Sequence, residues 1–80
     1  MPTVRRFSRS RIAMYFGDHP PPHFHVITVD DEEMQVEIET LDRIKGEADP
    51  RDISEALQWA ESNKEELRAR WREYSEEEWR

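Results

Sequence analysis

Hydrophobic and polar residues alternate along the first half of the chain, as they do in strands that bury one face. The clearest alternation covers residues 33–40, where the apolar positions of one face are Met34, Val36 and Ile38. This pattern predicts a half-buried antiparallel strand. A charged turn at residues 30–32 connects it to residues 23–29, which are apolar on both faces. We therefore expect residues 23–29 to form a central strand and to pair with residues 33–40 in a hairpin.

Three further segments are candidate strands. Residues 11–16 alternate, and their two predicted faces are Ile12, Met14 and Phe16 on one side and Arg11, Ala13 and Tyr15 on the other. Residues 4–7 and 43–46 are expected to add short edge strands. Residues 17–22 combine a Gly-Asp turn signal with three prolines, which cannot donate hydrogen bonds to a sheet. This composition predicts an extended crossing on the surface.

The second half of the chain changes to a helical period. Asp49 is a good N-cap and Pro50 fits the first helical position, so a helix is expected to begin there. Its apolar stripe consists of Ile53, Ala56, Leu57 and Ala60. A second helix is expected after residues 62–63, with an apolar face made of Leu67, Trp71 and Tyr74. We expect both helices within residues 49–75 and a frayed tail at residues 76–80, which include Trp79.

Together these elements predict a single α+β domain over residues 1–80. Residues 1–46 would be mostly β and form a small antiparallel β-meander of three to five strands, and the two C-terminal helices would pack on one of its faces. The chain has 80 residues, of which 35% are hydrophobic and 39% charged, so it can build only a thin core. A metal ion, a partner or a second copy of the chain would therefore add useful stability.

The composition argues against several classes of function. The chain has no cysteine, so it forms neither a disulfide nor a thiolate metal site. Two glycines, and no serine in a nucleophile-elbow pattern, argue against nucleotide hydrolysis and serine-hydrolase chemistry. The longest apolar run, residues 12–16, is far shorter than the roughly 20 residues of a membrane span. We therefore expect a cytoplasmic protein that makes no membrane contact.

Charge is distributed unevenly along the chain. Residues 1–29 carry four arginines and one aspartate, a balance of +3, whereas residues 30–80 carry eight basic and eighteen acidic residues, a balance of −10. The net charge is −7. Because an acidic chain repels the phosphate backbone at long range, nucleic acid is expected to bind only through the local basic strip, if at all. The acidic surface instead suits a basic protein partner.

The segment DHPPPHFHV, residues 18–26, is the most unusual stretch of the sequence. On a strand, His23 and His25 point to the same side with Cα atoms about 6.6 Å apart, within reach of one metal ion. Zinc needs at least three protein ligands, and the nearest further donors are His19 and Asp18. A polyproline path of about 12 Å holds His19 away from the pair unless a turn or a cis prolyl bond brings it back. One candidate function is therefore a histidine site for zinc or another divalent metal ion.

The same histidines also suit metal-free catalysis by a ribonuclease or phosphodiesterase. His23 and His25 would act as general acid and base, as RNA cleavage through the 2′-hydroxyl requires. Arg11, or alternatively Arg9, would hold the phosphate, and Tyr15 would orient a group or donate a proton. Both chemical interpretations need imidazoles that meet water. The structural alternative is a pair of strand histidines that are hydrogen-bonded to the glutamate-rich hairpin or to a helix acid.

The segments MPTVRRF, MYFGDHPPPHFHV, IETL and LQWAESNKEELRARW resemble the bacterial domain of unknown function 4160 family. The resemblance implies an intracellular protein that is often encoded beside another small protein, in an arrangement that looks like a toxin–antitoxin cassette. It carries over no catalytic residues.

The acidic surface and the thin core favour the same interpretation. We therefore predict a small cytosolic partner-binding component of a toxin–antitoxin-like two-gene cassette, which binds the neighbouring gene product or itself. The ribonuclease and metal-binding alternatives stay open. No cofactor is expected apart from the zinc or other divalent metal ion of the metal-binding alternative.

Overall fold

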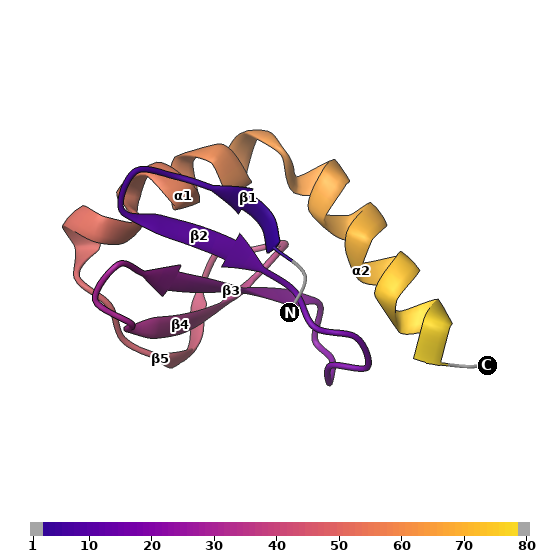
Figure 1. Cartoon of the computed structure of the whole chain (residues 1–80). Helices are drawn as coiled ribbons and strands as arrows, with labels where there is room; N and C mark the ends of the chain where they lie inside the picture. The colour runs from indigo at the N-terminus through magenta and orange to yellow at the C-terminus, as the bar shows by residue number, and fades with distance from the viewer. Residues whose placement is uncertain (1–2, 79–80) are drawn as a thin grey trace.

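The computed structural model describes residues 3–78, which form one five-stranded antiparallel sheet followed by two helices (Figure 1). The strands lie in the sheet in the order β1-β2-β3-β4-β5, which is a simple meander. The elements are β1 (Thr3–Arg6), β2 (Ser10–Ala13), β3 (His23–Thr28), β4 (Glu33–Glu37), β5 (Arg43–Gly46), α1 (Pro50–Ser62) and α2 (Lys64–Glu78). The predicted α+β architecture, with its meander and two C-terminal helices, is confirmed.

Strand β3 lies in the centre of the sheet, between β2 and β4, as its apolar residues on both faces predicted. Its register with β4 pairs Phe24 with Val36 and Val26 with Met34. These four side chains are buried and share one face of the sheet. Alternation in two adjacent strands therefore produces one continuous apolar surface.

Helix α1 covers this apolar surface, lying over β2 and β3 (Figure 1). Its buried residues Ile53, Ala56 and Ala60 belong to the same core cluster as the sheet residues. Helix α2 adds Leu67, which has no exposed surface, and Tyr74. From α1 it runs past the edge of the sheet (Figure 1), and Lys64 and Arg68 near its start donate hydrogen bonds to Glu39.

The start of α1 is fixed as the sequence predicted. The carboxylate of Asp49 accepts a hydrogen bond of 2.9 Å from the backbone N–H of Arg51, and Pro50 is the first helical residue. Buried Asp52 in the first turn forms an ion pair with Arg9 from the turn between β1 and β2. At the other end, the side-chain amide of Asn63 donates to the carbonyl of Trp59 at 2.8 Å. Side chains therefore satisfy polar groups at both ends of α1.

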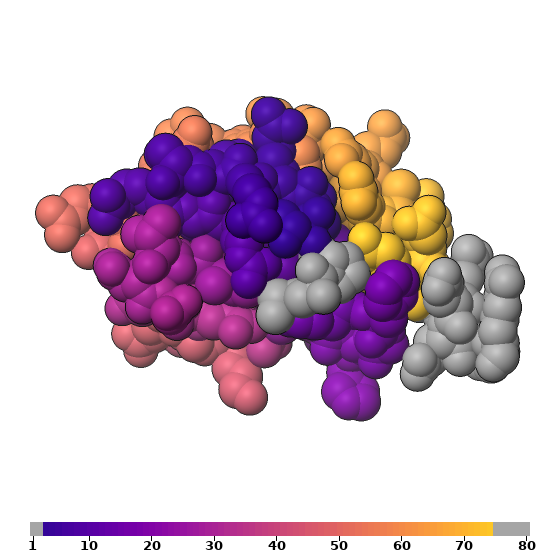
Figure 2. All heavy atoms as spheres, in the orientation of Figure 1, coloured from indigo at the N-terminus to yellow at the C-terminus, as the bar shows by residue number. Residues whose placement is uncertain are grey.

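The strand predicted at residues 11–16 is shorter than expected. Strand β2 ends at Ala13, and Phe16, predicted to share a strand face with Ile12 and Met14, is 53% exposed. Continuing the β2–β3 register would place Phe16 opposite Pro22, which has no N–H to donate. The chain therefore leaves the ladder and forms the loop of residues 14–22, where Phe16 packs on Tyr74 of α2 with ring centroids 4.5 Å apart. In Figure 2 the violet loop lies against the yellow part of α2.

Helix α2 continues to Glu78, beyond residue 75, where the sequence placed the end of the helices and the start of a frayed tail at residues 76–80. Residues 76–78 are glutamates, which have a high helix propensity, and neither Gly nor Pro interrupts them. Trp79 lies outside the described residues. Within the described part of the chain, neither helix is long and apolar enough to cross a membrane.

Candidate functional site

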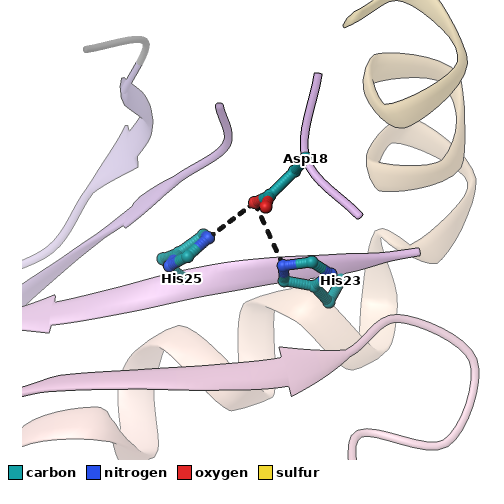
Figure 3. Close-up of side chains that lie close together, drawn as sticks. All are labelled: Asp18, His23 and His25. Carbon is teal, nitrogen blue, oxygen red and sulfur yellow. Dashed lines mark hydrogen bonds and ion pairs between the residues drawn. The ribbon is translucent and has the colours of Figure 1, made fainter. Parts of the chain in front are cut away.

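Asp18, His23 and His25 converge on the sheet face opposite α1 (Figure 3). His23 and His25 lie two residues apart on β3, so both rings leave the same face, as predicted. Asp18 comes from the loop after β2, which folds back over this face. Its Oδ2 atom lies 3.1 Å from Nε2 of His23 and 2.9 Å from Nε2 of His25.

Both imidazoles are buried, so the contact with water on which both chemical interpretations depended is absent from the structure. His23 and His25 are each only 5% exposed. The ring of Trp71 from α2 packs against His23 with centroids 5.3 Å apart, and the ring of Tyr15 meets His25 edge-on at 4.4 Å. The loop and α2 thus close over the histidines, and Asp18, whose side chain is 23% exposed, lies between the rings and solvent.

The Nδ1 nitrogen of each ring lies within hydrogen-bond distance of an oxygen acceptor. Nδ1 of His23 lies 2.7 Å from the carbonyl oxygen of Pro21, and Nδ1 of His25 lies 2.7 Å from Oε2 of Glu33. Carbonyl and carboxylate oxygens accept hydrogen bonds, so both Nδ1 atoms carry a proton and donate. In a neutral imidazole, Nε2 then carries the lone pair. Both Nε2 atoms point toward the same oxygen of Asp18.

This arrangement requires positive charge between the rings and Asp18, because a lone pair that faces a carboxylate oxygen is repelled. Two imidazolium protons supply the charge, but they place two buried cations side by side, with ring centroids 5.2 Å apart. One divalent metal ion supplies it to both contacts at once. Moreover, Nε2 of His23 is buried and makes no hydrogen bond within the described structure. Its 3.1 Å approach to Asp18 is therefore an electrostatic contact without hydrogen-bond geometry.

Asp18 is ready to act as an anionic ligand. Without a metal ion, burial alone would raise the pKa of Asp18, but a hydrogen bond from His25 and the charges that both histidines carry when protonated lower it more, so the pKa of Asp18 lies below its ordinary value. The backbone N–H of His19 also donates to its Oδ1 at 3.1 Å. The carboxylate is therefore ionised at neutral pH.

The geometry of the three donors fits a transition-metal ion. Their ligand atoms all lie within 4.8 Å of one another. In a tetrahedral zinc site with bonds of about 2.0–2.1 Å, ligand atoms are about 3.3 Å apart. The two distances from Asp18 to the histidines are close to this edge length. Two histidines and one carboxylate form a ligand set for zinc or ferrous iron that leaves a coordination position open.

The other predicted site residues lie outside this group. His19, the alternative third donor, is exposed and does not join the three converging residues. The peptide bond between Pro20 and Pro21 is cis. Arg9, the alternative phosphate ligand, is paired with Asp52.

Tyr15 and Arg11 lie beside the group rather than in it. Burial and the charge of Glu33 raise the pKa of Tyr15, while Arg11 opposes the shift. Arg11 donates to Thr3 at 3.2 Å. Its cross-strand partner Ile27 is two residues from His25 on the same face. Tyr15 thus packs against the histidines, whereas Arg11 lies on the same sheet face but further along the strands.

The contact between His25 and Glu33 bears out the structural alternative, in which a strand histidine is hydrogen-bonded to the glutamate-rich hairpin, although the sequence did not single out Glu33. Trp71 was treated as a core or interface anchor of its helix, and no local signal connects it to His23, from which it is separated by 48 positions along the chain. Strand register places Glu33 near His25, whereas the contact between Trp71 and His23 arises only from tertiary packing.

Fold and site together define a small α+β protein with a buried cluster of two histidines and an aspartate. The chain belongs to the family described as Domain of unknown function (DUF4160), whose family model matches residues 10–72. This match confirms the resemblance noted in the sequence and includes all three residues of the cluster. Comparison with curated proteins and comparison with solved structures found no significant match.

Proposed function

We propose that this protein binds one divalent transition-metal ion through Asp18, His23 and His25. The observation that carries the proposal is that both Nε2 atoms face one carboxylate oxygen while both Nδ1 atoms already donate elsewhere. Histidine ligands of metals are commonly oriented in this way, by a carbonyl or carboxylate on the second ring nitrogen. The protein would hold the metal on a rigid central strand and close the site with the loop of residues 14–22.

A metal-free acid–base role for His23 and His25 has less support. A general base must come within about 2.6–3.2 Å of the proton that it removes. Both rings are buried, and their Nε2 nitrogens already face Asp18. A substrate hydroxyl would have to displace this carboxylate to reach either imidazole.

The test is metal binding by the untagged protein. Metal-depleted protein is titrated with Zn²⁺ against a chromophoric chelator, and Co²⁺ is used to report the coordination number from its visible spectrum. We expect one ion per chain, and loss of binding in His23→Ala and His25→Ala. His19→Ala is the matched control, because His19 lies in the same segment but outside the cluster. Equal affinity in all three variants, with folded circular-dichroism spectra, would overturn the proposal.

We also propose, separately, that the protein is the cytosolic partner-binding component of a two-gene cassette. In addition to the family resemblance, the support is strand β5, whose four residues are all exposed at one edge of the sheet. Edge strands offer unpaired backbone groups to a strand of another chain. Ile44 on β5 is 42% exposed and would anchor such a contact.

Co-expression with the neighbouring gene tests this second proposal. We expect the two products to co-purify, and Ile44→Lys to weaken the complex while Val29→Lys does not. Val29 is the control because it is also exposed but lies in the turn after β3. Separate elution of the two products in size-exclusion chromatography would contradict partner binding.

A further inference from the structure

Aromatic contacts at the histidine cluster hold the distal half of α2, which extends beyond the sheet (Figure 1). The ring of Trp71 packs on His23 with centroids 5.3 Å apart, and Tyr74 packs on Phe16 of the loop after β2 at 4.5 Å. Tyr74 is only 7% exposed, and Trp71 is half-buried. The partners of both rings therefore lie in the cluster itself or in the loop that carries Asp18.

The proximal half of α2 is anchored by other contacts. Leu67 is fully buried in the core, and Lys64 and Arg68 donate hydrogen bonds to Glu39. These contacts involve neither Asp18 nor a histidine. Loss of the contacts at the cluster would therefore release the distal half of the helix and leave its beginning in place.

The contact between the loop and β3 depends on what lies between Asp18 and the two imidazoles. Both Nδ1 atoms donate to acceptors, so neutral rings direct two lone pairs toward Oδ2 of Asp18, at 3.1 and 2.9 Å. The carboxylate oxygen repels each lone pair, whereas a divalent cation attracts all three groups. Because Asp18 comes from the loop and both histidines come from β3, a bound ion joins these two segments.

We propose that metal binding locks the loop of residues 14–22 and the distal half of α2, residues 71–78, onto β3, and that metal loss releases both. The ion has three ligands in the closed state and only the two histidines once the loop has left, so it favours closure. The protein is thus a metal-responsive switch, in which occupancy of the cluster sets the position of the C-terminal helix. The inference rests on the proposed metal site and adds a second, open state to it.

Hydrogen–deuterium exchange of the full chain tests the switch by comparing metal-depleted protein with protein that holds one equivalent of Zn²⁺. We expect zinc to slow the exchange of amides in residues 14–22 and 71–78 by about tenfold or more, because these segments open locally without it, and to change α1 less. Equal exchange in the two forms, with zinc bound stoichiometrically, would overturn the switch and leave the metal site intact. Protection spread equally over α1 would show global stabilisation and would also overturn it. Absence of zinc binding in the chelator titration would overturn the metal site, and the switch with it.

Two tryptophan variants separate the switch from general packing of the helices. Both tryptophans are half-buried on helices, but Trp71 packs on His23, whereas Trp59 packs on Phe7. We expect Trp71→Leu to lower the Zn²⁺ affinity by about tenfold, because closure and metal binding favour each other, and to abolish the zinc-induced protection of residues 71–78. Trp59→Leu, the matched control, should retain both. Equal effects of the two substitutions on zinc affinity and on protection would contradict the inference.

Discussion

Oε2 of Glu33 lies 2.7 Å from Nδ1 of His25, across the β3–β4 pairing and on the same face of the sheet. This contact fixes which nitrogen of His25 carries the proton and turns Nε2 toward Asp18. Glu33 is thus a positioning residue for the cluster. Its carboxylate acts through the imidazole, without being one of the three proposed metal ligands.

Removing Glu33 should weaken metal binding without removing a ligand. We expect Glu33→Ala to lower the Zn²⁺ affinity by about 10-fold to 100-fold, the usual effect of losing a partner that orients a metal ligand. Glu33→Gln keeps an acceptor oxygen and should lose less. Competition with a chromophoric chelator measures both, and Glu47→Ala, an exposed glutamate in the β5–α1 connection, is the control. Wild-type affinity in Glu33→Ala would show that His25 is oriented by other contacts.

Metal affinity should rise with pH. Both imidazoles must release their Nε2 protons to bind a metal ion, so binding releases protons. The pKa of Asp18 lies below its ordinary value of 3.8, so this carboxylate is ionised at any pH above that value. It therefore adds no pH dependence near neutrality. Zn²⁺ titrations between about pH 5 and pH 8 should therefore give affinities that increase with pH. In Asp18→Asn the affinity should be lower throughout, with a similar slope. A flat profile in the wild type would contradict histidine ligation.

The contact between Phe16 and Tyr74 should hold the loop of residues 14–22 against α2. Aromatic pairs at a centroid distance of 4.5 Å typically contribute about 0.5–1.5 kcal/mol beyond the burial of their area. We expect a double-mutant cycle of Phe16→Leu and Tyr74→Leu, followed by urea unfolding, to give a coupling energy in this range. Since the loop carries Asp18, Phe16→Leu should also weaken Zn²⁺ binding. Additive effects of the two substitutions would show that the rings do not interact in solution.

Asp49 should stabilise α1 in a pH-dependent manner. Its pKa is lowered, first by the hydrogen bond from the Arg51 side chain and then by that from the Arg51 backbone N–H. The charged form is thus favoured in the folded state. Its contribution is present above the ordinary pKa of 3.8 and is lost as the pH falls through the lower folded value.

Two variants separate the charge of Asp49 from its capping oxygen. We expect Asp49→Ala to lower Tm at pH 7 by about 4–8 °C, and Asp49→Asn, which keeps a capping oxygen, by less. The difference between wild type and Asp49→Asn should disappear in strongly acidic buffer. Thermal scans by circular dichroism at pH 7 and at low pH measure this difference. A constant difference at all pH values would assign the effect to something other than the carboxylate charge.

Local rules predicted most of the fold. The alternation at Met34 and Val36 gave the inward face of β4, and the cap at Asp49 gave the start of α1. Errors occurred where a distant residue decided the outcome. Phe16 continues the local alternation, but its partner across the ladder would be Pro22, and its ring packs on Tyr74 instead.

By itself, the sequence determined that His23 and His25 share one face of a central strand, because side chains of a strand alternate with a period of two. It also supplied Asp18 and His19 as candidates for a third ligand, with the three prolines arguing against His19. Only the tertiary structure chose between them, because the path of the loop after β2 brings Asp18 over the rings and leaves His19 exposed. The burial of both rings beneath Trp71 and Tyr15 was likewise decided by packing between segments far apart in sequence, which no local period encodes.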